Sequence, residues 1–229
     1  MVSVEIDRGR SKQTIRMGFT GQRLTAFGGM VLWSGFLRKV GFSEQLGELL
    51  PHQPRARNAL KPLEIALGFL GGIILGADKL TRISWLSQDS ALAEVLGIVR
   101  MPSQSTFSRF FAGFTQRGAE QLQQLYPWML RRLPSRRGGY TLDLDSTALL
   151  HEDGHQEGVR VGYSRKGLKP CHHPLIAVLA EVKMVAGYWL RSGNCSDAGN
   201  AAVLVGSLLD RLPAQIRIGL VQPIFRERK

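Results

Sequence analysis

This sequence of 229 residues has few cysteines, few acidic side chains and few long apolar runs. These features limit the kinds of fold, of membrane association and of partner that we expect. Two cysteines, Cys171 and Cys195, are too few to build a disulfide-stapled fold. The apolar run from Leu67 to Leu75 is interrupted by glycines and is too short to cross a bilayer. The first residues lack the basic and then apolar layout of a signal peptide. We therefore expect a cytoplasmic protein with no membrane partner.

Acidic residues are outnumbered by basic ones. The chain carries 30 Lys and Arg against 18 Asp and Glu, which gives a formal net charge of +12 and an isoelectric point of about 10.4. Residues 1–139 hold 19 of the basic and 9 of the acidic side chains, so most of the surplus lies there. A surplus this one-sided favours a nucleic-acid partner over an ordinary basic surface.

The part of the chain before Gly139 has mostly helical periodicity. After a short hairpin near the start, apolar spacing predicts helices after Gly28-Gly29, from Pro62 onward and from Gly118 to Leu133. Shorter helices are expected at 83–86 and 91–96, where Asp89 or Ser90 can cap the second. The glycines of the helix after Pro62 weaken it or allow close helix packing.

A serine-rich segment opens one further helix in this region. Its polar side chains, followed by an arginine, are typical of the second helix of a helix-turn-helix and could contact phosphates or base edges. The candidate DNA contacts are Ser103, Gln104, Ser105, Thr106 and Arg109. The alternative is an ordinary capped helix that packs Phe107 and Phe110 into a core, and both interpretations can hold on opposite faces.

A basic segment containing proline and glycine, Arg131 to Gly139, predicts a domain boundary, so that residues 1–139 and 140–229 form two domains. Beyond it the period changes to alternation. Strands are expected at 140–145, 159–163 and 215–221, with strand-like segments at 174–181 and 184–191. A helix over 198–212 precedes the last strand, an order that suits a mixed sheet covered by helices.

The strand from Tyr140 to Asp145 places two carboxylates, Asp143 and Asp145, on one face. Paired carboxylates repel each other, and a hard cation is the usual way to keep both ionised. On spacing alone, a strand with a solvated acidic face is the simpler interpretation.

Two further groups of polar residues follow that strand. Arg165, Lys166 and Lys169 flank Gly167, as in phosphate-binding loops, although a solvated hairpin fits equally well. Cys171-His172-His173 with Cys195 lacks the paired spacing of a zinc site, so we expect packing or DNA-backbone contact from the histidines instead.

Several ordered motifs resemble the DDE transposases of bacterial insertion sequences, and most closely the insertion-sequence thirteen-eighty group. The resemblance covers most of the chain, up to about Val221. The motifs are Leu24–Gly29, Ser103–Arg109, Leu142–Thr147, Gln156–Gly158, Gly162-Tyr163, His172–Leu175 and Leu190–Asn194.

This resemblance implies an α+β chain with a helical DNA-binding region followed by a partial ribonuclease-H-like α/β domain. It also implies DNA transposition by metal-dependent phosphoryl transfer, in which three carboxylates hold two divalent cations, usually Mg²⁺. The first of these ligands, and the catalytic one, would be Asp145, with Asp143 in a supporting role. The implied partner is the double-stranded DNA of element ends, and a homodimer is compatible with the family.

The chain departs from the family after the strand at 216–221. There the family has its second catalytic Asp, whereas this sequence continues with Gln222-Pro223, and the later Glu is missing too. The expectation is therefore a C-terminally truncated and inactive fragment. The alternatives are a non-catalytic DNA-binding module that occupies element ends, or an unstable pseudogene product.

Overall fold

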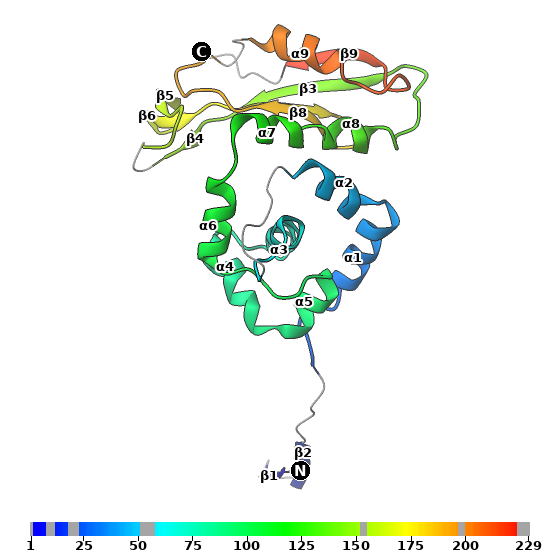
Figure 1. The fold of residues 1–229 in the computed structure, drawn as a ribbon, viewed down its shortest axis with the longest axis vertical. Coiled ribbons are helices and arrows are strands. Elements are labelled where there is room, and N and C mark those ends of the chain that lie inside the picture. The colour runs from blue at the N-terminus through cyan, green and yellow to red at the C-terminus, as the bar shows by residue number, and fades with distance from the viewer. Residues whose placement is uncertain are drawn as a thin grey trace. The chain divides into compact units, whose positions relative to one another are not determined.

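The computed structural model describes residues 2–7, 12–17, 23–50, 58–151, 155–196 and 200–223. The chain divides into two compact units, Met1–Thr115 and Gln116–Lys229 (Figure 1). This division lies upstream of the domain boundary that the basic segment ending at Gly139 predicts. The reason is that Leu130 is buried in the core of the second unit, so the segment before Gly139 connects two elements of one unit.

The first unit is a hairpin followed by helices. The strands pair antiparallel, as the alternation near the start predicts. One helix, α2, was not predicted. The elements are β1 (Val2–Asp7), β2 (Lys12–Met17), α1 (Met30–Lys39), α2 (Phe42–Leu49), α3 (Pro62–Ile74), α4 (Leu80–Trp85), a 3₁₀ turn η1 (Leu86–Gln88), α5 (Ser90–Leu96) and α6 (Gln104–Ala112).

Helix α3 is the centre of this unit, and Figure 1 shows the other helices arranged around it. Pro62 occupies its first turn, and the Lys61 N–H donates to the Glu64 carboxylate over 2.8 Å. A Cβ placed on Gly72 would lie 2.7 Å from the Ile83 side chain, so only glycine lets α4 approach this closely. Close helix packing is thus the role of the α3 glycines.

In the described residues of the second unit, two helices precede two β-sheets, and a third helix precedes the last strand. A four-stranded sheet has the order β8-β7-β3-β9, antiparallel except for the parallel pair β3–β9, which makes it the mixed sheet expected from the sequence. A smaller sheet has the order β4-β6-β5. The elements are α7 (Gln116–Leu122), α8 (Leu125–Leu130), β3 (Tyr140–Ser146), β4 (Leu149–Leu150), β5 (Arg160–Ser164), β6 (Gly167–His172), β7 (Leu175–Leu179), β8 (Met184–Trp189), α9 (Ala201–Leu209) and β9 (Ile218–Pro223).

Two predicted elements differ from those observed. The single helix expected over 118–133 is two helices, because Pro127 lacks an N–H and its ring clashes with the carbonyl four residues earlier, which ends α7 before Gln123. The segment after Ser164 forms a hairpin, one of the two interpretations that the sequence left open, and Gly167, with a φ of +84°, starts β6 directly. The strand β5 lies in the smaller sheet rather than beside β3.

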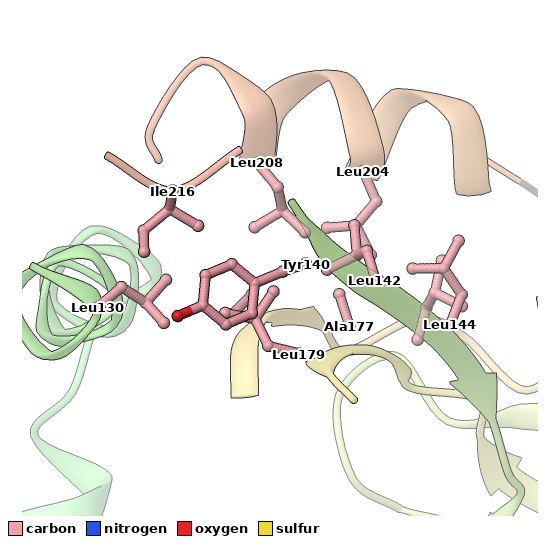
Figure 2. Packing of buried hydrophobic residues seen from close by; sticks show 11 residues of the cluster. Leu130, Tyr140, Leu142, Leu144, Ala177, Leu179, Leu204, Leu208 and Ile216 are labelled. Atoms are coloured by element: carbon pink, nitrogen blue, oxygen red, sulfur yellow. The ribbon is translucent and has the colours of Figure 1, made fainter. Parts of the chain in front are cut away.

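The core of the second unit lies between α9 and one face of the large sheet (Figure 2). Tyr140, Leu142 and Leu144 alternate along β3 and point into this core, where Leu204 and Leu208 of α9 meet them. Within the described ranges, no helix has both the length and the apolar character to cross a bilayer.

Candidate functional site

The side of β3 that faces away from the α9 core carries both candidate carboxylates. Asp143 is half-buried and Asp145 is exposed, and they alternate with the buried Leu142 and Leu144. The strand and the shared face of the two acids are therefore as predicted. Asp145 also receives a hydrogen bond at its Oδ1 from the backbone N–H of Ser146, over 2.8 Å. This bond draws the carboxylate toward the end of the strand.

The end of β9 lies beside these carboxylates. The two strands run parallel, with Gln222 in register with Asp143 and Pro223 in register with Leu144. Residues in register on neighbouring strands point to the same face, so the Gln222 side chain shares the face of Asp143. The resemblance places a second catalytic Asp at the end of this strand, but the residue observed there offers an amide.

A pair of divalent cations does not fit the described residues. Mg²⁺ takes oxygen ligands, and a two-metal site needs more than two carboxylates. Nowhere in the described part of the chain do three His, Cys, Asp or Glu side chains come together as a metal-binding group. Asp143 and Asp145 are therefore an incomplete ligand set, and Gln222 adds at most one neutral amide oxygen.

A buried polar network holds the residue that follows Asp145. The Ser146 hydroxyl lies 3.1 Å from Nδ1 of His173 and 3.0 Å from Nη2 of Arg191, and both partners are buried. Arg191 also donates from Nε to the His173 carbonyl over 2.9 Å and from Nη1 to the Ser196 carbonyl over 3.1 Å. The end of β3 is thus tied to the segments that flank β7 and β8.

The partners of His173 occupy both of its ring nitrogens. Its Nε2 lies 3.0 Å from the carbonyl oxygen of Tyr163, which can only accept, so Nε2 carries a hydrogen. Its Nδ1 shares a hydrogen bond with the Ser146 hydroxyl, whose oxygen also accepts from the Arg191 guanidinium. The His173 ring therefore links the end of β3 to the Tyr163 carbonyl on β5.

Two further histidines, His151 and His172, are also held by hydrogen bonds. Nε2 of His172 donates to the Glu157 carbonyl over 2.9 Å, and Nδ1 of His172 shares a hydrogen bond with Nε2 of His151, also over 2.9 Å. The two rings link β4, β6 and the turn before β5. These bonds give the two histidines a structural role.

Among the described residues, two side chains near the large sheet, those of Tyr126 and Glu181, have shifted pKa values. Burial, and then the neighbouring Tyr188, raise the pKa of the Tyr126 phenol above its ordinary value. Desolvation alone would raise the pKa of Glu181, but hydrogen bonds, including those from the Thr141 N–H over 3.0 and 3.1 Å, and the charge of Arg136 hold it below its ordinary value. Glu181 thus stays ionised at neutral pH and fixes the start of β3.

The candidate DNA contacts of the first unit lie on α6. The Ser103 side chain caps this helix by accepting from the Thr106 N–H, and it also bonds the hydroxyls of Ser105 and Thr106. Gln104 and Arg109 are exposed. Residues 97–103 separate α5 from α6, a longer connection than the roughly three- to four-residue turn of a helix-turn-helix.

The opposite side of α6 packs into the core of the first unit. Phe107 and Phe110 are buried, and the Phe111 ring lies edge-on to Phe69 with 4.8 Å between centroids. The capped, aromatic-faced helix is therefore present, and its outer face leaves Gln104 and Arg109 open to a partner.

The other predicted DNA contacts lie on the β5–β6 hairpin of the second unit. Arg165 and Lys166 form its two-residue turn, which the Ser164 hydroxyl closes by accepting from the Lys166 N–H and donating to the Gly167 carbonyl. Lys169 follows on β6, and all three basic side chains are exposed. The hairpin therefore presents two positive charges at its turn and a third along β6.

Sequence reasoning missed the roles of Ser146, His173 and Arg191. All three lie in motifs that carry the family resemblance, the segments 142–147, 172–175 and 190–194. Their presence in separate motifs was the available signal, because motif residues distant in sequence often meet in space. The sequence alone could not show that these three motifs meet at one strand end.

The comparisons with known proteins agree with this architecture. A family model described as the transposase DDE domain, group 1, matches residues 7–223, which includes the carboxylate strand β3 and its neighbour β9. No curated protein and no solved structure matches the chain significantly. Because the family model spans most of both units, the chain belongs to the transposase DDE domain family, group 1.

Proposed function

We propose that this chain is a DDE-type DNA transposase that binds the double-stranded DNA of element ends and carries the first catalytic carboxylate, Asp145. The observation that supports this best is the position of Asp145. It is exposed at the end of a buried strand, with Asp143 on the same face, inside the region that the family model matches. An exposed carboxylate on a rigid strand end suits a ligand better than a core role.

DNA binding is proposed for both units. In the first, Ser103, Gln104, Ser105, Thr106 and Arg109 lie at or near the outer face of α6, in the part of the chain that holds most of the basic surplus. In the second, the exposed Arg165, Lys166 and Lys169 gather at the β5–β6 hairpin. Cationic side chains of this kind contact phosphates and make affinity depend on salt.

The described residues do not supply a complete two-metal site for phosphoryl transfer. Family members use divalent metal ions for phosphoryl transfer, and Asp145 and the weaker candidate Asp143 could offer oxygen ligands to Mg²⁺. Two carboxylates and an amide fall short of the ligands that a two-metal site requires. We therefore propose a chain that binds DNA without cleaving it on its own.

A paired binding and nicking assay tests this proposal. The purified chain should bind duplex DNA at low salt, and with Mg²⁺ or Mn²⁺ it should nick supercoiled plasmid no faster than Asp145→Ala does. Nicking that disappears in Asp145→Ala would show that the catalytic site is complete. Failure of the folded chain to bind duplex DNA at low salt would refute the DNA-binding role.

Three finer assignments are proposed with it. Membership of the insertion-sequence thirteen-eighty group rests on the motifs from Leu24 to Asn194, and the ribonuclease-H-like assignment rests on the order of β3, β7, β8, α9 and β9. A homodimer is proposed only by analogy with the family. Sedimentation of the purified chain with and without DNA would decide the last point.

A further inference from the structure

An open groove of about 1420 Å³ runs along the outer strand β8 of the large sheet, within the second unit. Its walls are α7 and α8 on one side and the end of β8 on the other, and Arg211, just beyond α9, completes it. In the view of Figure 1, α7 and α8 lie on one side of this sheet and α9 on the other. Its volume exceeds the roughly 300 to 1,000 Å³ of pockets that enclose small molecules, so we expect a longer chain as its occupant.

Three guanidinium groups give the groove its charge. Arg117, Arg131 and Arg211 all line it and all are exposed. In the part of the chain that the structure describes, none of them forms a salt bridge with a carboxylate. The acidic side chain in the lining, Glu120, accepts a hydrogen bond from Gln116 over 2.9 Å. The groove is therefore net positive and its arginines are available to an anion.

The remaining lining suits nucleic acid better than an acidic peptide. Gln121 and Gln124 provide amides that can bond base edges or phosphate oxygens, and Tyr188, a residue that is 38% exposed, offers an aromatic ring. Tyr126 packs edge-on against Tyr188, with 6.4 Å between ring centroids, and so fixes its orientation. Cations, amides and a fixed aromatic platform are what single nucleotides of a strand bind.

The register of the sheet connects the groove to Asp145. Asp145 on β3 is paired with Ile176 on β7, and Ile176 is paired with Tyr188 on β8. Directly opposed residues in antiparallel strands point to the same face, so Asp145 and Tyr188 share one face, two strands apart. At about 4.8 Å per strand their backbones are roughly 10 Å apart. That span is about three nucleotides at roughly 3.4 Å each.

We propose that this groove holds the DNA strand that leads to Asp145, with Arg117, Arg131 and Arg211 on its phosphates and Tyr188 against a base. The inference rests on the proposed function, since it names the path of the same substrate. It adds a contact surface in the second unit that is separate from α6 and from the β5–β6 hairpin.

The first test compares two triple variants of the full chain that remove the same charge. The groove variant is Arg117→Gln, Arg131→Gln and Arg211→Gln. The control is Arg137→Gln, Lys183→Asn and Arg217→Gln, which changes exposed residues near the opposite end of the sheet. Binding to a fluorescein-labelled duplex is measured by anisotropy between about 50 and 200 mM salt.

The groove variant should bind about tenfold more weakly, and its slope of log affinity against log salt should fall by about 2 to 3, close to one per lost phosphate contact. The control should change the affinity by about twofold or less. The triple Arg→Lys variant of the groove keeps its charge and should keep most of the affinity, which separates lost contacts from misfolding. Equal losses in the groove and control variants would overturn the proposal.

The second test detects DNA at the groove itself, so DNA that is bound to the first unit does not hide the result. The photocrosslinker p-azidophenylalanine replaces Tyr188, or Lys183 as the control position, and the complex with duplex DNA is irradiated. Crosslinking should be several-fold greater from position 188. If the wild-type chain binds DNA but position 188 gives no more crosslink than position 183, the groove is refuted while the proposed function stands. If the wild-type chain binds no DNA, both are refuted.

Discussion

The strands β3 and β9 lie side by side and run in the same direction, yet they are held in different ways. One face of β3 is buried in the α9 core, and its end is tied through Ser146 to His173 and Arg191. Strand β9 is exposed from Gly219 to Pro223 and forms an edge of the sheet. The anchored strand carries two carboxylates, and the exposed one carries Gln222 at the matching position.

The comparison distinguishes the contacts that hold a carboxylate in place from the groups that complete its set of metal ligands. Asp145 itself is paired with Ile176 of β7 and not with a residue of β9, and the next residue, Ser146, is bonded to Arg191. A complete ligand set, by contrast, depends on what the end of β9 contributes. The placement of Asp145 and the completion of the ligand set are therefore two separate properties, and each can be tested with its own variants.

The largest effect is expected from breaking the buried face of β3. Leu142 is fully buried, so Leu142→Ala leaves a cavity and should lower the free energy of unfolding by about 2 to 5 kcal/mol. Leu220 on β9 is 55% exposed, and Leu220→Ala should change it by about 0.5 kcal/mol or less. Urea denaturation of both variants measures the contrast. Similar losses in the two would mean that β9 is as well packed as β3.

An intermediate effect is expected from the network at the end of β3. His173→Phe leaves the Ser146 hydroxyl and the Tyr163 carbonyl without their imidazole partner, which should cost about 1 to 3 kcal/mol of unfolding free energy. Because the network ties down this strand end, hydrogen exchange at the amides of Asp145 and Ser146 should accelerate more than at Leu142.

The exposed His155 supplies the control for that experiment. His155→Phe makes the same chemical change at the surface and should leave exchange at Asp145 and Ser146 as it is in the wild type. If His173→Phe lowers stability but speeds exchange uniformly along β3, the network contributes to the core in general and does not position the strand end.

Sequence periodicity predicted most of the fold and the shared face of the two acids, because alternation and helical spacing are local properties. It predicted β3 and its buried face correctly. For the α3 glycines it left two roles open, a weaker helix or close packing, and the structure shows close packing. It placed one helix across Gln123, where the ring of Pro127 breaks the helix. It could not show that Ser146, His173 and Arg191 meet, because that contact depends on the pairing of β3 with β7.

The groove could not be predicted from the sequence either. Its residues come from α7, α8, β8 and the segment after α9, and no local pattern joins Arg117 to Arg211. The departure at Gln222 was visible in the sequence, but its position beside Asp143 follows only from the parallel register of β3 and β9. The sequence pattern therefore identified Asp145, whereas the residues around it could be identified only from the pairing of the strands.

The smallest effect on stability, and the sharpest test of the comparison, is expected from Gln222→Asp. This change places a third carboxylate beside Asp143, on the same face. Without metal the added negative charge should lower the free energy of unfolding by about 1 kcal/mol or less, because the position is exposed and solvent weakens the repulsion. Gln222→Asn has the shape of Asp without its charge and should behave like the wild type.

Addition of Mn²⁺ should reverse the order of these two variants. A cation bound by three carboxylates stabilises the folded chain in proportion to the logarithm of its concentration over its dissociation constant. The melting temperature of Gln222→Asp should therefore rise with Mn²⁺ more than that of Gln222→Asn, and Asp145→Ala in the same background should abolish the difference. Equal responses of the Asp and Asn variants would mean that the end of β9 does not reach the carboxylates of β3. The site would then have to be completed by residues from elsewhere than β9.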